Sequence, residues 1–255
     1  MFLNRKYLED YIEKQPITLQ KHFDKLKKVG TTVENFNFYF SNSAVYSSMI
    51  EGNSINLDSY YKYSHSGMNT NGKSFTEIED LKAAYSFAKD SKLTLENVLA
   101  VHKILTNTLI EDQKYRGEIR DKDVYIFSNG VKIYTGASKD IVNQELTSLF
   151  TAVEQLLTDD LTLTESFYFA SYIHLYFAQI HPFADGNGRT ARLVEKWFLA
   201  QKLGTNAWFI QSEKLYQKRL KMYYKTINLG ENYSTLNYNL ALDFLCMLPM
   251  ALRLK

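Results

Sequence analysis

The stretch His181-Pro-Phe-Ala-Asp-Gly-Asn-Gly-Arg-Thr-Ala-Arg192 is the most informative part of this 255-residue sequence. It follows residues 165–180, which are apolar nearly all round, as in a helix at the centre of a fold. Because Pro182 would interrupt that helix, His181 is predicted to lie at a rigid elbow just beyond its end. A second helix is predicted to start at the glycines that follow, over residues 188–202.

These twelve residues contain the groups that a phosphate-transfer site needs. A helix N-terminus behind two glycines presents backbone N–H groups and positive potential, which suit a phosphate. Arg189 and Arg192 are three residues apart and can point to one side of that helix, where guanidinium groups would bind phosphate oxygens. Asp185 offers an oxygen ligand of the kind that Mg²⁺ prefers. With His181 as a base, we predict an active site here.

Each part of the pattern also has a purely structural interpretation. A histidine and a proline after a helix are usually a plain loop, and Gly-Asn-Gly is usually a turn. However, eight positions together fit His-x-Phe-x-[Asp/Glu]-Gly-Asn-Gly-Arg-x-x-Arg. At average residue usage, chance would produce that match in roughly one window in a billion. The combination therefore favours function over structure alone.

The rest of the chain is predicted to be mostly helical. There are only three prolines, and glycines occur in few places, so long stretches contain no helix breaker. Residues 54–74 are rich in Ser, Asn, Gly and Tyr and are predicted to be an irregular loop. Helices are predicted over residues 5–29 (two short helices separated at Pro16 and ended by Gly30), 33–50, 76–90, 95–110 after Thr94 as N-cap, 139–157 after Ser138 as N-cap, 213–229 and 235–248.

Residues 122–135 carry the one strong β signal. Apolar residues flank Ser128-Asn129-Gly130, and Asn-Gly is favoured at the turn of a β-hairpin. The sequence contains no internal repeat, low-complexity tract or obvious linker. We therefore predict an all-α fold: one helical domain with a single hairpin.

The composition indicates an ordinary soluble globular protein, with 45% hydrophobic and 23% charged residues. A net charge of +2 gives no electrostatic reason to expect a nucleic-acid partner. No apolar run is long enough for a membrane span, and the N-terminus lacks the apolar core of a signal peptide. The single cysteine, Cys246, excludes an internal disulfide. We expect a cytoplasmic protein with neither nucleic acid nor membrane as a partner.

A second, weaker motif is Ser47-Ser-Met-Ile-Glu51-Gly52, at the end of the helix predicted over residues 33–50. Gly52 suits the left-handed position just past a helix end. A serine and a glutamate four residues apart also occur on ordinary solvated helix faces. The motif therefore indicates little when taken alone.

The stretch from His181 to Arg192 resembles the signature of the Fic (filamentation induced by cAMP) family, with every defining position filled. The resemblance implies a helical core with a β-hairpin flap, in agreement with the hairpin predicted independently at 122–135. The resemblance is expected to extend over about residues 33–248. The implied organisation is a single Fic-type domain, 1–255, with N-terminal helices including an inhibitory helix over 1–53 and a catalytic core over 76–248.

The resemblance implies a protein adenylyltransferase that uses ATP and Mg²⁺. His181 would take the proton from a Ser, Thr or Tyr hydroxyl of a protein substrate, and this hydroxyl would attack the α-phosphorus of ATP and release pyrophosphate. Asp185 would hold Mg²⁺. The implied phosphate-binding residues are Gly186, Asn187, Gly188, Arg189 and Arg192.

Two further regions resemble functional parts of the family. Tyr216, Arg219 and the pair Tyr223-Tyr224 resemble a Tyr-x-x-x-Arg-x-x-x-Tyr-Tyr region, in which Tyr224 would pack either on adenine or in the core. The hairpin is either a plain structural element or a flap that pairs with the target in strand fashion. The residues expected to face the target are Val131, Lys132, Ile133 and Tyr134.

With the signature downstream, Ser47 and Glu51 resemble the family's inhibitory motif. The resemblance implies that Glu51 pairs with Arg192 and occupies the space that the γ-phosphate needs. ATP would then bind with its α-phosphate misaligned for attack. Because the motif precedes the core in the same chain, inhibition would act in cis.

Several alternatives remain open at the level of sequence. The same fold could transfer another nucleotide, phosphocholine or, as in the Doc branch, a phosphate, although Gly188 argues against the Doc chemistry. It could also remove AMP from a modified protein, or act as a catalytically silent nucleotide-binding regulatory module. Self-modification and a homodimer are both compatible with the sequence.

Overall fold

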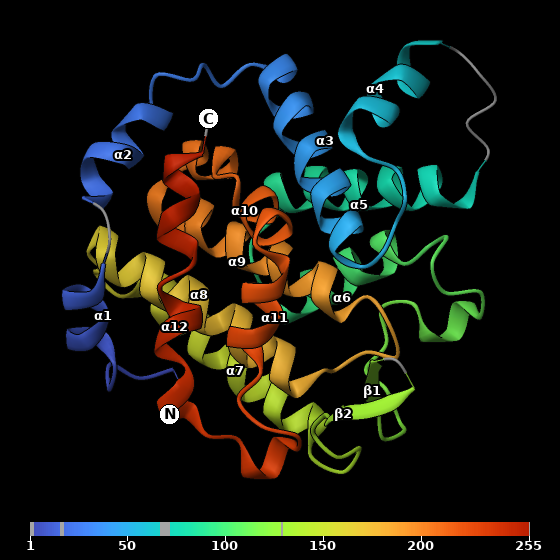
Figure 1. Cartoon of the computed structure of the whole chain (residues 1–255), viewed down its shortest axis with the longest axis vertical. Helices are drawn as coiled ribbons and strands as arrows, with labels where there is room; N and C mark the ends of the chain where they lie inside the picture. Colours follow the sequence, from blue (N-terminus) through green and yellow to red (C-terminus); the bar gives the residue numbers. More distant parts are fainter. Residues whose placement is uncertain (1–2, 16–17, 67–71, 129, 255) are drawn as a thin grey trace.

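The computed structural model of the chain describes residues 3–15, 18–66, 72–128 and 130–254. The predicted break at Pro16 and the predicted turn residue Asn129 lie outside these residues. The fold is all-α with one β-hairpin, as the sequence predicts. Figure 1 shows the helices gathered around a central pair, with the hairpin at the lower right.

The central pair consists of α8 (Leu163–Ile180) and α9 (Asn187–Leu203), which pack along each other. A capping box begins α8: the Thr162 side chain accepts the Glu165 N–H, and the Glu165 side chain accepts the Thr162 N–H. Nearly all of α8 is buried, as its unbroken apolar sequence predicts. The helix ends at His181, so the signature loop starts from the rigid centre of the molecule.

The other helices surround this pair. One wall is formed by α3 (Val33–Ile50), which packs against α5 (Lys73–Lys89) and α10 (Ser212–Lys218). The helix α6 (Leu95–Leu105) joins α5 to α9, and Thr94 caps its first turn as predicted. Five further helices surround the pair: α1 (Leu8–Lys14), α2 (Leu19–Leu26), α7 (Val142–Thr158), α11 (Leu220–Ile227) and α12 (Leu242–Leu245).

The hairpin pairs β1 (Tyr125–Ser128) with β2 (Val131–Thr135) in antiparallel register. A bulge lies between Ile126 and Phe127, because Ile126 pairs with Tyr134 whereas Phe127 pairs with Lys132. Such a bulge changes the direction in which the following side chains point. The hairpin therefore presents a twisted rather than a flat surface.

The loop predicted over residues 54–74 is partly wrong, because α4 (Leu57–Ser66) lies within it. The Asn56 side chain accepts the Ser59 N–H, as a helix N-cap does. Tyr60 is buried, stacks on Phe75 and donates its hydroxyl to Glu79. Burial of Tyr60 against α5 stabilises a helix that the polar local sequence did not indicate.

Three other helix predictions need correction. The helix after the hairpin starts at Val142, and Ser138 acts through its backbone carbonyl in the preceding turn rather than as a side-chain cap. The predicted helix 213–229 is interrupted at Arg219, whose φ of −115° and ψ of 37° leave the helical region. The predicted helix 235–248 is instead a series of short elements: η3 (Tyr233–Thr235), η4 (Tyr238–Leu240), α12 and η5 (Leu248–Arg253).

Local side-chain chemistry explains the broken C-terminal segment. The Asn237 side chain accepts the Asn239 N–H and stabilises a turn that competes with a continuous helix. Pro249 lies in the first turn of η5, where a proline is tolerated, but it would break a helix that continued through it.

Candidate active site

The loop that joins α8 to α9 is fixed by Asn187. Its side-chain oxygen accepts the Phe183 N–H (2.8 Å), and its side-chain nitrogen donates to the Phe183 carbonyl (2.9 Å). The Phe183 ring is fully buried. The Asn187 side chain, which the sequence predicted to bind phosphates, therefore closes the loop on itself, and only its backbone N–H is left for a ligand.

His102 also supports this loop, and no sequence motif marks this residue. Its ring stacks on Phe183 with 3.6 Å between centroids. Its Nε2 donates to the Asp185 carbonyl (2.9 Å), and its Nδ1 accepts the Gly117 N–H (2.9 Å). Burial lowers the pKa of His102 to about 4, so the ring is neutral and can donate and accept at the same time.

Gly186 is required by both conformation and space. Its φ is 77°, in the left-handed region that favours glycine. A Cβ there would lie 2.9 Å from Thr106 Cγ2 and 3.3 Å from His102 Nε2. The close approach to α6 aims the N-terminus of α9 and its free N–H groups toward the site.

His181 is held in an unusual backbone conformation at the end of α8. Its φ of 55° is the one positive value of a non-glycine residue within the described ranges. Arg120 donates from Nε to the His181 carbonyl (2.8 Å) and also to the carbonyls of Lys122 and Ala137. These bonds hold the strained elbow in place.

The hydrogen bonds of His181 leave one ring nitrogen free. Nδ1 donates to the Ala178 carbonyl (3.3 Å), which places the lone pair on Nε2. Burial lowers the pKa of His181 to about 4, with a further lowering from the Arg120 charge, against the opposite effects of the Ala178 carbonyl, Glu51 and Asp185. The ring is therefore neutral near pH 7 and can accept a proton.

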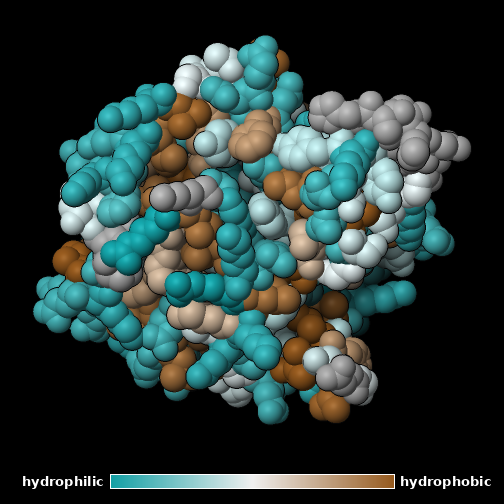
Figure 2. Space-filling view, turned by 45° about the horizontal axis from the view of Figure 1, so that its top comes forward, coloured by the Kyte–Doolittle hydropathy of each residue, from teal (hydrophilic) through white to brown (hydrophobic). Residues whose placement is uncertain are grey.

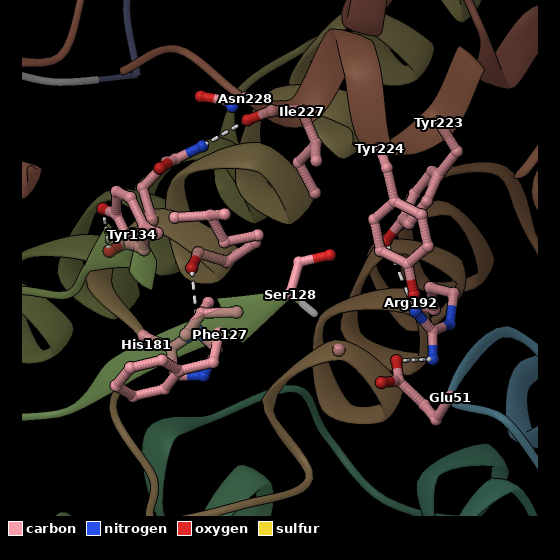
Figure 3. A pocket seen from close by; sticks show the side chains of 15 residues that line it. Glu51, Phe127, Ser128, Tyr134, His181, Arg192, Tyr223, Tyr224, Ile227 and Asn228 are labelled. Atoms are coloured by element: carbon pink, nitrogen blue, oxygen red, sulfur yellow. Dashed lines mark hydrogen bonds and ion pairs between the residues drawn. The ribbon is translucent and has the colours of Figure 1, made fainter. Parts of the chain in front are cut away.

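A cavity of about 600 Å³ lies between the hairpin, the end of α8, the start of α9 and α11. Figure 3 shows His181 on one side of it and Arg192 on the other, with Tyr224 and Ile227 above. A cavity of this size suits a small organic ligand. It is lined by Glu51, Ile126, Phe127, Ser128, Ile133, Tyr134, Ala178, Gln179, His181, Gly188, Arg192, Tyr223, Tyr224, Ile227 and Asn228.

Arg192 lies at the base of this cavity and is fully buried. Its Nε donates to the Ser47 hydroxyl (2.9 Å), and its Nη2 donates to the Ser47 carbonyl (3.1 Å) and to Glu51 Oε1 (2.7 Å). Its Nη1 donates to the Tyr223 hydroxyl (3.3 Å). The structure thus contains the pair of Glu51 with Arg192 that the sequence predicted, and Ser47 is part of the same contact.

Glu51 lies directly on the backbone of α9. A Cβ at Gly188 would collide with Glu51 Oε1, so only glycine allows this approach. Burial alone would raise the pKa of Glu51, but the positive charges of Arg192 and Arg189 hold it below its usual value. The ionised carboxylate therefore occupies the place where a helix N-terminus and an arginine would attract a phosphate.

Arg189 and Asp185 lie at the N-terminus of α9. Arg189 is only 6% exposed, with Nη2 3.6 Å from Glu77 Oε2, and its Nε has no hydrogen-bond partner in the described part of the protein. Asp185 is exposed, and its Oδ1 accepts the Gly186 N–H (2.6 Å).

The donor set fits Mg²⁺ brought by a nucleotide better than a metal held by protein alone. No cluster of three or more His, Cys, Asp or Glu side chains suited to a metal occurs among the described residues. Asp185 supplies one exposed carboxylate next to an anion site. Mg²⁺ in phosphate-transfer sites is commonly held in this way, by one or two carboxylates together with substrate phosphates and water.

Tyr224 lies on the cavity rather than in the core. Its ring is 48% exposed, and its hydroxyl donates to the Ile50 carbonyl (2.9 Å) at the end of α3. Its neighbour Tyr223 is the buried member of the pair. The sequence left open whether Tyr224 packs on a nucleotide base or in the core, and in the structure it lies beside the cavity.

The four predicted flap residues divide into two pairs. Ile133 and Tyr134 line the cavity, and the Tyr134 hydroxyl donates to the Gln179 carbonyl (2.7 Å), which fastens the hairpin to α8. Val131 and Lys132 are exposed and lie outside the cavity lining. Two of the four residues therefore border the cavity, and their role in docking a target stays a prediction.

The hairpin exposes large hydrophobic side chains. Tyr125, Phe127, Val131 and Ile133 are 40–65% exposed. Figure 2 shows hydrophobic atoms gathered at the lower right, where the hairpin projects. Apolar exposure of this kind is typical of a surface that another chain covers.

No helix in the described ranges is long and apolar enough to cross a membrane.

Known proteins match both the sequence and the fold. Residues 92–199 match the model of the Fic/DOC family. The chain is 31% identical over 157 residues to the protein adenylyltransferase fic-1 of Caenorhabditis elegans and 30% identical over 155 residues to the protein adenylyltransferase Fic of Culex quinquefasciatus. Each alignment covers 57% of this chain but only 28% and 29% of these relatives, so it spans less than a third of their length.

Two solved structures share the fold. A Fic family protein from Desulfovibrio desulfuricans has a TM-score of 0.72 at 20% identity and is matched over 94% of this chain and 74% of its own. A fragment of Fic-1 from C. elegans has a TM-score of 0.64 at 20% identity, over 97% of this chain and 69% of its own. At this level of identity the likeness concerns the fold alone.

Proposed function

Because residues 92–199 of this chain form a domain of the Fic/DOC family, we propose that it is a protein adenylyltransferase, which moves AMP from ATP to a Ser, Thr or Tyr hydroxyl of a protein. The observation that carries the proposal is the His181 ring: it is neutral, has Nε2 free and lines the cavity that also contains the N-terminus of α9. Curated relatives named protein adenylyltransferase align with 57% of this chain.

The proposed reaction is an in-line substitution at the α-phosphorus. Nε2 of His181 takes the proton of the target hydroxyl while the hydroxyl oxygen forms a bond to the α-phosphorus of ATP. The bond from the α-phosphorus to the oxygen that bridges to the β-phosphate breaks, and pyrophosphate leaves. No covalent enzyme intermediate is required, so positioning and charge stabilisation account for the catalysis.

The residues around His181 would bind the phosphates. The N–H groups of Asn187 and Gly188 lie at the positive end of α9, whereas the Gly186 N–H donates to Asp185 Oδ1, and the missing side chain at Gly188 lets a phosphate approach the backbone. Arg189 and Arg192 would stabilise negative charge on the leaving pyrophosphate. Asp185 would hold Mg²⁺, which neutralises phosphate charge when bound.

We propose that Glu51 holds this site in an inhibited state. Glu51 lies against the backbone at Gly188 and pairs with Arg192, and a γ-phosphate would need both of these contacts. The negative charge of Glu51 also repels that phosphate. ATP would have to bind without these partners, with its α-phosphate displaced from the line of attack. Inhibition in cis follows because Ser47 and Glu51 belong to α3 and its C-cap in the same chain.

The direct test is intact-mass spectrometry after incubation with ATP and Mg²⁺. The Glu51→Gly protein should gain AMP, on itself or on an added protein substrate, at least tenfold faster than the wild type. Adding His181→Ala should abolish the gain. Equal labelling of wild type and Glu51→Gly would contradict the inhibitory role, and labelling that survives His181→Ala would contradict the base.

The hairpin is proposed to bind the target protein. Target docking on the strand Val131–Thr135 is supported by the exposed hydrophobic side chains there.

A cytoplasmic location is supported by the lone, buried Cys246. Self-modification and a homodimer remain predictions, as does the division into residues 1–53 and 76–248, and native mass spectrometry of the labelled protein tests the first two together.

A further inference from the structure

A chain of buried polar groups leads from Arg192 away from the cavity and into the core. Arg192 Nη1 contacts the Tyr223 hydroxyl (3.3 Å), which lies 3.0 Å from His174 Nε2. His174 Nδ1 lies 2.7 Å from Glu195 Oε2. All four residues are at most 2% exposed. Figure 3 shows the first link, between Tyr223 and Arg192 at the edge of the cavity.

The proton positions along this chain follow from the chemistry of its ends. The Glu195 carboxylate can only accept, so His174 Nδ1 carries a hydrogen and donates to it. At the other end, Arg192 can only donate, so its bond uses a lone pair of the Tyr223 oxygen and leaves the Tyr223 hydrogen to donate to His174 Nε2. Every bond in the chain thus has one donor and one acceptor, all oriented in the same direction.

The three residues that bind the Arg192 guanidinium do not belong to the same part of the fold. Ser47 and Glu51 both lie at the C-terminal end of α3. Tyr223 lies on α11, and it is fixed from behind by His174 of α8 and Glu195 of α9. If the end of α3 moves, Tyr223 is the partner that does not move with it.

We propose that Tyr223, oriented by His174 and Glu195, is a positioning residue that keeps the Arg192 guanidinium aimed at the terminal phosphate of a nucleoside triphosphate after Glu51 has been displaced. This inference rests on the proposed function. It gives Glu195 a definite role as a buried carboxylate that orients Tyr223 through His174. It also explains why a phenyl ring without the hydroxyl would not suffice at Tyr223, since the hydroxyl oxygen is the acceptor for Arg192.

A purely structural role is the competing explanation, because Tyr223 also packs its ring against His174, Tyr216 and Phe244. Tyr216 offers a matched control. Its hydroxyl donates to the same Glu195 oxygen (2.8 Å), and it is fully buried, but it is not on the path to Arg192. A structural role predicts the same result at both tyrosines.

The test compares ATP with ADP, which lacks the phosphate that Arg192 would bind. Dissociation constants are measured by calorimetry with Mg²⁺ in the Glu51→Gly protein. Adding Tyr223→Phe should weaken ATP binding by roughly three- to tenfold, as expected for one lost hydrogen bond, and should change ADP binding by less than about twofold. Adding Tyr216→Phe should leave the ratio of the two constants unchanged.

Two results would overturn the inference while the proposed function stands: an equal loss of ATP and ADP affinity in Tyr223→Phe, or the same loss of ATP preference in Tyr216→Phe. Should Tyr223→Phe fail to fold, His174→Phe keeps the tyrosine hydroxyl and removes its acceptor, and it should reduce the ATP preference in the same direction. Failure of the Glu51→Gly protein to bind either nucleotide would instead overturn the proposed function and this assignment with it.

Discussion

At the scale of single residues, the proposed function depends on the protonation of His181. Because burial lowers the His181 pKa to about 4, the ring stays neutral at pH values well above 4 and is available for the proposed role as a base. The Glu51 carboxylate raises this pKa, so the kcat/KM of the Glu51→Gly protein should rise with pH through a midpoint no higher than about 4 and stay flat from about 5.5 to 8. Pyrophosphate release measured across this range checks it, and a midpoint near the ordinary histidine value of about 6.5 would contradict it.

Gly186 allows a second residue-scale prediction, since its conformation and its crowding can be separated. Gly130 has nearly the same φ of 78°, but a Cβ there meets nothing within 4 Å, whereas a Cβ at Gly186 would lie 2.9 Å from Thr106. Gly130→Ala should cost about 1 kcal/mol of unfolding free energy from backbone strain. Gly186→Ala should cost about 1–3 kcal/mol more from overpacking, measured by urea unfolding. Equal costs would show that α6 moves aside.

The residues of the signature were predictable because a short motif fixes their order, but their contacts were not. His102 lies 79 positions before His181 in the sequence and has no motif of its own. Its contribution depends on α6 and α9 packing against each other, which only the folded chain shows. Asn187 was identified from the sequence as a phosphate-binding residue, but its side chain forms hydrogen bonds with the Phe183 backbone.

At the scale of elements, α3 is built into the core rather than laid on its surface. A buried ion pair joins Lys196 Nζ of α9 to Glu213 Oε2 of α10 (2.6 Å), and the Ser43 hydroxyl of α3 contacts both. Tyr85 of α5 donates to the other oxygen of Glu213 (2.6 Å). Four helices therefore meet at one buried carboxylate. Relief of inhibition is expected to move the Glu51 side chain and the last turn of α3, not the whole helix.

This anchor makes a stability prediction. Lys196→Met leaves Glu213 buried without its counter-charge, which should cost about 3–5 kcal/mol of unfolding free energy. The matched control is Lys62→Met, which breaks the exposed pair with Asp58 on α4 and should cost at most about 1 kcal/mol. Chemical denaturation measures both. A cost near 1 kcal/mol for Lys196→Met would mean that α3 is only weakly anchored.

The elements themselves were predictable where one local pattern dominates. The helices α3, α8 and α9 and the hairpin follow from apolar periodicity, breakers and turn residues, and their positions agree with the sequence to within a few residues. The helix α4 and the series of short elements after α11 depend on tertiary contacts, such as burial of Tyr60, and on turns at Asn237 that compete with a helix. Periodicity alone cannot weigh such contacts.

At the scale of the whole molecule, the contact proposed to be inhibitory also joins two helices. Ser47, Glu51 and Arg192 link α3 to the central helix α9 through the buried guanidinium. Under the proposed function, the carboxylate that blocks the substrate is also expected to stabilise the fold. Nucleotide binding would then have to replace the contact that the displaced carboxylate supplied.

Thermal unfolding tests that linkage. Without nucleotide, Glu51→Gly should lower the unfolding free energy by about 1–3 kcal/mol, because Arg192 keeps Ser47 and Tyr223 but loses its direct counter-charge. For a chain of this size, each kcal/mol lowers Tm by about 2–4 °C. With saturating ATP and Mg²⁺, Tm should rise more in Glu51→Gly than in the wild type, since no bound carboxylate has to leave.

The control for this measurement is ADP, which should raise the Tm of the two proteins by similar amounts because it does not compete with Glu51 for Arg192. A Tm that increases on Glu51→Gly without nucleotide would mean that burial of the pair costs more than its attraction returns. In that case the carboxylate is kept at a cost to stability, and its occupation of the phosphate site is the remaining physical reason for its presence.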